Sequence, residues 1–216
     1  KGQQKPADAE VPVYGPCKLL DIELETAFII GKRTEMGDSV STANADDHIF
    51  GMVLFNDWSA RDIQTWEYIP LGPFLSKNFA STISPWIVTL EALEPFRVKG
   101  YVQDPPLLPY LQYKGDRNLD IKLDVYLKPE NGKENHVISS NYKFMYYTME
   151  QQLAHHTVNG CNINVGDMMA SGTISGPEQK EFGSFMELTW RGTKPITLND
   201  GTERKFVNDH DTIILR

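Results

Sequence analysis

The 216-residue sequence has few cysteines, no long apolar run and no cluster of basic residues. Its 2 cysteines, Cys17 and Cys161, are too few for a disulfide scaffold or a four-cysteine zinc site. No apolar run approaches the roughly 20 residues that cross a bilayer, so we expect no membrane partner. A net charge of −8 without clustered Lys and Arg argues against a nucleic-acid partner.

The sequence also has no Asn-x-Ser/Thr glycosylation site. Together with the scarcity of cysteine, this is typical of a reducing compartment, and we predict a cytoplasmic location. The hydrophobic fraction of 40% and the charged fraction of 23% are those of a globular protein. We expect one domain over residues 1–216, with residues 1–13 as a linker or arm. Because the first residue is Lys rather than Met, we expect the chain to be part of a longer protein.

Most of the pattern indicates short strands. The run 118–129, NLDIKLDVYLKP, alternates apolar and polar residues, and ENGKEN at 130–135 is typical of a turn, so a hairpin is predicted. A single long helix is predicted over 141–160, with Asn141 as its N-cap and His156 in the core. The predicted fold class is mainly β (α+β), with a closed or rolled sheet and one long helix.

Three acids alternate in the stretch LLDIELETAFIIG, residues 19–31: Asp21, Glu23 and Glu25. On one strand they would share a face, about 7 Å apart. Two carboxylates at that distance repel by about 2 kcal/mol at an effective dielectric constant near 20, and a divalent cation would remove the repulsion. Oxygen ligands favour Ca²⁺ or Mg²⁺. A solvent-facing strand edge explains the same alternation, so both interpretations stand at this point.

A second charged segment, residues 55–86, mixes polar and aromatic residues. Asp57, Arg61 and Gln64 lie close together in it, and Lys77 is its only charged residue between Ile69 and Trp86. An isolated lysine in an apolar loop is either a buried ammonium aimed at an anion or a side chain that extends to the surface. The sequence pattern favours neither.

Four blocks of the sequence resemble the fumarylacetoacetase branch of the fumarylacetoacetate hydrolase family. They are LLDIELETAFIIG, HIFGMVLFNDWSARDIQTWEYIPLGPFLSKNFASTISPW, YTMEQQLAHHTVNGCNINVGDMMASGTISG and FGSFMELTWRGTKPI. The resemblance implies a catalytic-type domain with a mixed β-sandwich roll, working as a homodimer. It also implies metal-assisted hydrolysis of a carbon–carbon bond in 4-fumarylacetoacetate, which yields fumarate and acetoacetate in tyrosine and phenylalanine breakdown.

The resemblance further implies roles for individual residues. The first metal would bind Glu23, Glu25 and Asp57, and a second, structural Mg²⁺ would lie near Lys77 and Ser81. The implied cofactors are Ca²⁺, Mg²⁺ or both. The implied catalytic residues are Arg61, Gln64, Lys77 and Glu187, and the implied substrate contacts are Gln64, Tyr68 and Thr173. Asp21 is expected to be a neighbour at the strand edge.

The sequence departs from the family pattern at the general base. The family's catalytic histidine lies upstream of this segment, with a further metal-binding aspartate, and none of the five histidines here occupies that motif. We therefore expect this chain alone to keep the metal-binding geometry and lack turnover. Two alternatives remain. One is another activity of the superfamily on 1,3-diketo or 2-oxo acids, such as acylpyruvate hydrolysis or oxaloacetate decarboxylation. The other is a non-catalytic metal-binding or dimerisation module.

Overall fold

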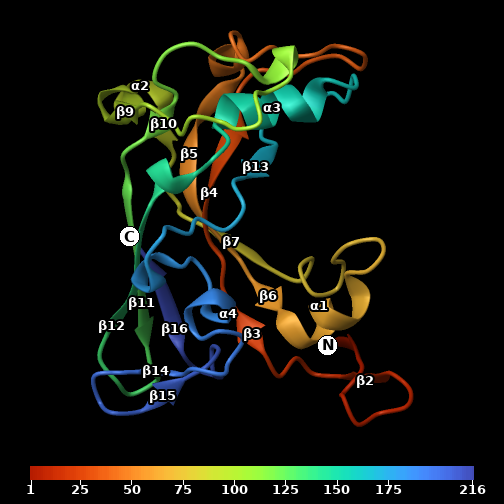
Figure 1. Ribbon diagram of the computed structural model, residues 1–216, viewed down its shortest axis with the longest axis vertical. Coiled ribbons are helices and arrows are strands. Elements are labelled where there is room, and N and C mark those ends of the chain that lie inside the picture. Colours follow the sequence, from red (N-terminus) through yellow and green to blue (C-terminus); the bar gives the residue numbers. More distant parts are fainter.

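The longest strand, β5, belongs to an antiparallel sheet at the centre of the molecule. The computed structural model describes all residues 1–216, and β4 and β5 run side by side through its middle (Figure 1). Both strands are rich in branched and aromatic side chains and are buried along most of their length, which is typical of central strands. The strands of this sheet are β4 (Leu24–Ile30), β5 (Ile49–Asp57), β7 (Ser81–Ile83), β8 (Val88–Thr89) and β13 (Met168–Ala170).

A second antiparallel sheet contains the predicted hairpin. It has the order β12-β11-β16, made of β11 (Lys122–Lys128), β12 (Asn135–Asn141) and β16 (Thr212–Leu215). The alternation predicted for this segment is confirmed, since Leu123, Val125 and Leu127 are buried while the residues between them are less so. The last strand of the chain pairs with the free edge of β11, so this edge is not left open.

Four pairs of short strands complete the β structure. Residues 1–13, predicted as a linker or arm, fold back on themselves, because β1 and β2 pair and β1 packs against the first helix. The pairs are β1 (Gly2–Gln4) with β2 (Val13–Gly15), β3 (Leu20–Asp21) with β6 (Ser59–Ala60), β9 (Arg97–Val98) with β10 (Asn118–Leu119), and β14 (Ile196–Thr197) with β15 (Glu203–Arg204).

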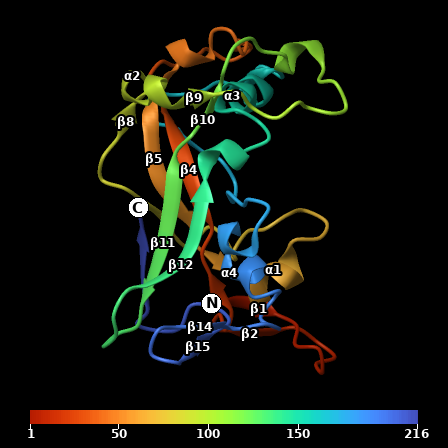
Figure 2. The same ribbon diagram turned by 60° about the vertical axis from the view of Figure 1, so that its left-hand side comes forward.

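The helices are short and lie around the sheets (Figure 2). None is both long and apolar enough to pass through a bilayer. The α-helices are α1 (Arg61–Glu67), α2 (Leu90–Leu93), α3 (Met149–Thr157) and α4 (Phe185–Leu188). The 3₁₀ turns are η1 (Ala45–Asp47), η2 (Glu94–Phe96), η3 (Pro109–Leu111), η4 (Tyr142–Phe144) and η5 (Gln179–Glu181).

The predicted helix over 141–160 is wrong in its first half. Helix α3 begins only at Met149, because the Thr148 hydroxyl accepts from the backbone N–H of Gln151 and the Gln151 side chain accepts from Thr148 in return. Asn141 caps a helix as predicted, but that helix is the short η4. The core position of His156 is also wrong, since this residue is exposed at the end of α3.

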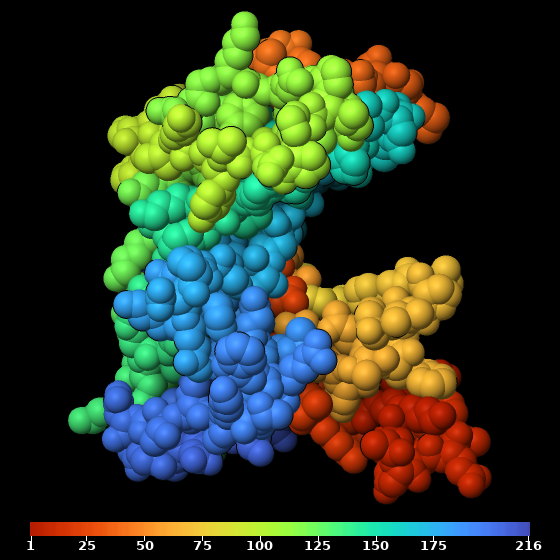
Figure 3. Space-filling view, in the orientation of Figure 1, coloured from red at the N-terminus to blue at the C-terminus, as the bar shows by residue number.

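The main hydrophobic core lies between the two larger sheets and joins them. Phe28 from β4, Leu123 from β11 and Phe185 from α4 belong to the same cluster of 25 buried residues. The sixteen strands, beside four short α-helices, confirm the prediction of a mainly β fold, and the shared core holds its two larger sheets together. A broad hollow remains on one side of the molecule, between α3 and the segment that contains α1 (Figure 3).

Removing the N-cap of α3 should destabilise the protein. Thr148 is 1% exposed, so Thr148→Ala would leave a buried N–H without its acceptor, and we expect a loss of about 1 kcal/mol in the free energy of unfolding by urea. Thr148→Ser keeps the hydroxyl and should retain most of that stability. Equal losses in the two variants would show that packing of the methyl group, and not the cap, is what matters.

Candidate metal and catalytic site

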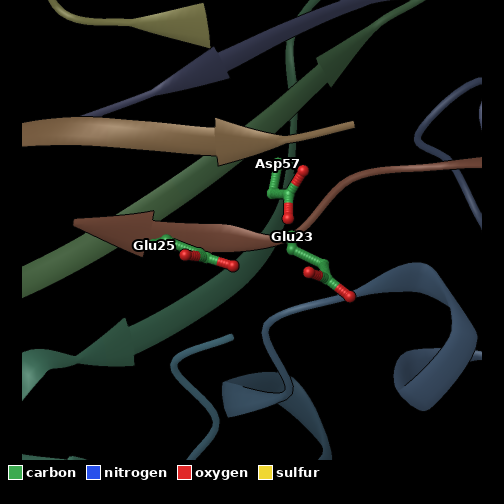
Figure 4. A group of neighbouring side chains, drawn as sticks. All are labelled: Glu23, Glu25 and Asp57. Carbon is green, nitrogen blue, oxygen red and sulfur yellow. The ribbon is translucent and has the colours of Figure 1, made fainter. Parts of the chain in front are cut away.

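Three carboxylates meet where the central strands end. Glu25 lies in β4, Glu23 directly precedes β4, and Asp57 is the last residue of β5. The backbone N–H of Asp57 donates to the Glu23 carbonyl over 3.3 Å, which places the two side chains next to each other. Oxygen atoms of all three carboxylates lie within 4.8 Å of one another (Figure 4). The structure thus brings together the three residues predicted as ligands of the first metal, and their metal role stays a prediction.

Asp21 is not a member of this cluster, which agrees with its expected place as a neighbour, but residues 19–31 do not form the single strand on which the three acids would share a face. The strand is interrupted at Ile22, because β3 pairs with β6 whereas β4 pairs with β5. Asp21 also accepts a hydrogen bond from the N–H of Ile22 over 2.8 Å, in place of a strand contact. Its side chain is fully buried, and it is linked to the carboxylate cluster through Arg61, which also pairs with Glu23.

Burial and mutual repulsion raise the pKa of Glu25 to about 8. Burial is the larger cause, and the negative charges of Glu23 and Asp57 add to it. The backbone N–H of Gly172, which donates over 2.9 Å, and the charge of Lys77 oppose the shift by favouring the charged form. They do not outweigh the burial and the neighbouring negative charges.

Two cations lie against the cluster. Lys77 Nζ is 2.5 Å from Glu23 Oε2 and 3.1 Å from Asp57 Oδ2, and Arg61 Nη1 is 2.9 Å from Glu23 Oε1. Burial raises the pKa of Glu23, but the charges and hydrogen bonds of Lys77 and Arg61 outweigh it, so this pKa is lowered. At Asp57 burial prevails and raises the pKa. The Lys77 side chain is 17% exposed, so the interpretation of a buried ammonium aimed at anions is confirmed.

Helix α1 places the polar residues beside these cations. Arg61 is its first residue, and Arg61 Nη1 donates to Gln64 Oε1 over 3.0 Å, one turn later. Tyr68 follows the helix as its C-cap and is 49% exposed. Gln64 therefore lies at the cluster, whereas Tyr68 faces solvent, and the predicted roles of both stay predictions.

A pocket of about 420 Å³ opens beside Glu23 and Arg61. Thr173 and Glu187, both predicted as functional, line it. The Glu187 carboxylate accepts hydrogen bonds from Ser175 Oγ, at 2.9 and 3.0 Å, and from Ser184 Oγ, at 2.9 Å. The pocket is lined by Glu23, Arg61, Phe144, Met145, Tyr146, Thr173, Ser175, Ser184, Met186 and Glu187.

The second predicted metal position has less support in the geometry. Ser81 begins β7 and pairs through its backbone with Asp57, but its side chain is exposed. Lys77 directs its ammonium group toward the carboxylate cluster. The structural Mg²⁺ near Lys77 and Ser81 therefore stays a prediction.

No histidine lines the pocket beside the carboxylates. His136 contacts Asp124, and His155 contacts Tyr110 near the exposed end of α3. A general base of the imidazole type is thus absent from this pocket. The histidines of the chain are His48, His136, His155, His156 and His210.

Asp21 has a function in the site that the sequence pattern did not predict. Its carboxylate accepts from Arg61 Nε over 2.9 Å and from the first backbone N–H groups of α4, those of Phe185 at 2.8 Å and Met186 at 3.0 Å. It therefore joins the helix that carries Glu187 to the guanidinium of Arg61. The alternation drew attention to Asp21, but no local pattern gives these partners, which lie 40 and 164 positions away.

The residues present fit a hard divalent cation. All donors of the cluster are carboxylate oxygens, which Mg²⁺ and Ca²⁺ prefer and which differ from the nitrogen and sulfur ligands of zinc. Burial first, and then the charges of Glu23 and Asp57, raise the pKa of Glu25, and a bound cation would oppose both effects by favouring the charged carboxylate.

Neutralising Glu25 should change stability and cation binding in opposite directions. Because the pKa of Glu25 is raised to about 8 in the folded chain, its proton is lost from the folded state as pH rises through 8, and the cation-free protein should lose stability up to that pH. Glu25→Gln should remove this slope and raise the melting temperature at pH 8.5 by a few degrees, since 1 kcal/mol corresponds to about 2–4 °C at this size.

The same variant should lose the stabilisation by Mg²⁺ or Ca²⁺ that the unmodified chain shows in thermal melts. Glu130→Gln, in the turn between β11 and β12, is the matched control and should behave as the unmodified chain does. A Glu25→Gln protein that still gains stability from either cation would contradict the assignment of this ligand.

Replacing Asp21 should be far more disruptive than replacing an exposed acid. Asp21→Asn would turn an amide NH₂ toward N–H donors and remove the charged partner of the buried Arg61 Nε, leaving Glu23 to pair with Arg61, so we expect a loss of about 3 kcal/mol in urea unfolding. Asp120→Asn removes an ion pair between half-exposed side chains and should change stability little. Similar losses in both variants would refute the importance of the Asp21–Arg61 contact.

Known proteins resemble this chain in sequence and in fold. The fumarylacetoacetases of Homo sapiens and Arabidopsis thaliana are 56% identical over 215 residues and 55% identical over 214 residues. Each alignment covers 99% of this chain and 51% of the relative. The chain therefore spans about half the length of the curated relatives it matches.

Solved structures support the fold alone. A fumarylacetoacetate hydrolase from Exiguobacterium antarcticum matches with a TM-score of 0.56 at 22% identity, over 100% of this chain and 57% of that one. A yeast protein of the fumarylacetoacetate hydrolase family matches with a TM-score of 0.55 at 19% identity, over 95% and 64%. The model of the fumarylacetoacetate (FAA) hydrolase C-terminal family matches residues 4–216. The chain therefore belongs to the fumarylacetoacetate hydrolase family, in the C-terminal part that this model describes.

Proposed function

We propose that this chain forms the metal-binding part of an enzyme that hydrolyses a carbon–carbon bond in 4-fumarylacetoacetate, with fumarate and acetoacetate as products. The observation that carries the proposal is the cluster of Glu23, Glu25 and Asp57 within 4.8 Å, flanked by Lys77 and Arg61. Relatives that share more than half of their aligned residues with this chain and bear the name fumarylacetoacetase support the choice of substrate.

The three carboxylates would hold one divalent cation, Mg²⁺ or Ca²⁺. When bound, such a cation acts as a Lewis acid toward the oxygens of a 1,3-diketo acid. Glu25 must lose the proton that its raised pKa favours before it can serve as a ligand, which ties occupancy to pH.

The cations of the chain would stabilise the charge that the reaction develops. Water adds to the keto carbon of the fumaroyl group and the bond from this carbon to the neighbouring methylene carbon breaks. Its electron pair leaves on the acetoacetate fragment as an enolate, which then takes up a proton. Lys77 and Arg61 can stabilise the oxyanion and the enolate from fixed positions. Gln64, oriented by its hydrogen bond with Arg61, offers its amide N–H to the same oxygens.

The attacking water needs a general base, and we propose that a histidine outside these 216 residues supplies it. Glu187 would orient that histidine. Its carboxylate is held at the pocket wall by Ser175 and Ser184, and hydroxyl donors leave it acceptor capacity for a further partner. Thr173 and Tyr68 would contact the substrate.

We further propose a cytoplasmic homodimer acting in tyrosine and phenylalanine breakdown. The name of the relatives supports the pathway. Large exposed apolar side chains, among them Leu71 at 78% and Trp86 at 79%, support a protein interface on the segment between α1 and β8.

Two other functions stay open to test. One is hydrolysis of an acylpyruvate or decarboxylation of oxaloacetate at the same site. The other is a non-catalytic metal-binding or dimerisation role, which the absence of a histidine from the pocket would permit.

A spectrophotometric assay with fumarylacetoacetate separates these possibilities. We expect Mg²⁺- or Ca²⁺-dependent turnover by the full-length gene product and none by the 216-residue chain alone. In the full-length protein Asp57→Ala should abolish turnover, and Lys77→Met should reduce kcat by about 10²–10³-fold, as loss of an oxyanion partner does. Glu130→Gln serves as the control.

Each other outcome has a definite meaning. Robust hydrolysis by the 216-residue chain would exclude an external histidine as the base. Preference for an acylpyruvate or oxaloacetate over fumarylacetoacetate would favour the first alternative. Cation binding by the full-length protein without turnover of any of these acids would favour the non-catalytic role.

A further inference from the structure

The loop that leads from α1 to Lys77 has little apolar support. Its large apolar side chains face solvent: Ile69 is 69% exposed, Leu71 78%, Phe74 54% and Leu75 46%. Hydrophobic burial within one copy of the chain therefore does not determine the path of this loop, and polar contacts must hold it there.

The strongest polar contact in the loop is made by Glu67, the last residue of α1. Its Oε1 accepts from the N–H of Phe74 over 2.7 Å, the N–H of Ser76 over 2.8 Å and Ser76 Oγ over 2.6 Å. Its Oε2 accepts from the N–H of Leu75 over 3.2 Å. Three consecutive backbone donors and one hydroxyl thus converge on a single carboxylate, which is a strong, charge-assisted arrangement.

These contacts also keep Glu67 ionised. Partial burial raises its pKa, but the hydrogen bonds from Ser76, Phe74 and Leu75 outweigh burial and lower it. Ser76 is fully buried, and its carbonyl accepts from the N–H of Ala60, at the start of α1, over 2.9 Å. Ser76, at the end of the loop, is therefore hydrogen-bonded to residues at both ends of α1.

Lys77 comes directly after the residues that Glu67 holds. Its N–H donates to the Phe74 carbonyl over 3.1 Å, and its ammonium reaches Glu23 and Asp57. A lysine side chain is flexible and can keep two such contacts only if its backbone is held in place. Helix α1 begins with Arg61 and ends with Glu67. Because Glu67 binds the backbone just before Lys77, the helix links the position of Lys77 to that of Arg61.

We propose that Glu67 is a positioning residue that places Lys77 against the carboxylate cluster by binding the backbone of residues 74–76. The catalytic meaning of this contact rests on the proposed function, in which Lys77 stabilises developing negative charge. The placement itself does not depend on any turnover.

The test uses the cation-free 216-residue chain and two readouts that need no substrate. The first is hydrogen exchange of the amides of Phe74, Leu75 and Ser76. The second is the reactivity of Lys77 toward trace acetic anhydride, quantified by mass spectrometry, with the exposed Lys122 as an internal reference. Glu67→Gln keeps the size of the side chain but turns an NH₂ group toward the donors, and Glu130→Gln is the matched control.

In Glu67→Gln we expect amide exchange at 74–76 to rise by about 10-fold or more, since hydrogen bonds to a charged group are lost. Lys77 acetylation relative to Lys122 should rise several-fold. Ser76→Ala removes one of the four donors and should show both effects to a smaller degree, so it decides the matter if Glu67→Gln does not fold. Glu130→Gln should change neither readout.

Two results would overturn the proposal. Faster exchange at 74–76 with unchanged Lys77 reactivity would show that Glu67 holds the loop without positioning Lys77. No change in either readout would show that the loop is held by other contacts. Failure of the proposed function would instead appear as absent turnover in the full-length protein with both readouts behaving as expected.

Discussion

The site depends on a balance of charge at the ends of β4 and β5. Glu23, Glu25 and Asp57 are brought within 4.8 Å by strand pairing, and the folded chain compensates them only with Lys77 and Arg61. Burial and the charges of Glu23 and Asp57 together raise the pKa of Glu25 to about 8. A divalent cation would neutralise the remaining negative charge. Without it, the stability of the protein should depend on pH, because Glu25 loses its proton in the folded state.

Carboxylates outside the cluster hold the cations that face it. Asp21 binds the Nε of Arg61 and the start of α4, and Glu67 binds the backbone just before Lys77. Both contacts are charge-assisted, and Asp21 is fully buried, so they can fix the directions of flexible side chains. The chemistry proposed for the site thus relies on acids that bind other groups of the protein and lie outside the proposed metal ligands.

Much of the fold could be predicted from local sequence, but its boundaries could not. The alternation in 118–129 and the turn at 130–135 predicted the β11–β12 hairpin, because period-two burial is a local property. The helix over 141–160 was predicted too long, because the capping box at Thr148 competes with the apolar spacing that includes Met145. His156 was placed in the core by the same spacing, and it is exposed because α3 ends directly after it.

The sequence by itself determined which residue types were available: acids at alternating positions, one isolated lysine and the blocks that identify the family. Only the tertiary structure decided which of them meet. Asp21 lies outside the acid cluster because β3 and β4 pair with different strands, and its carboxylate binds the start of α4, 164 positions away. Such contacts depend on strand pairing and chain return over long separations, which no local pattern of side chains encodes.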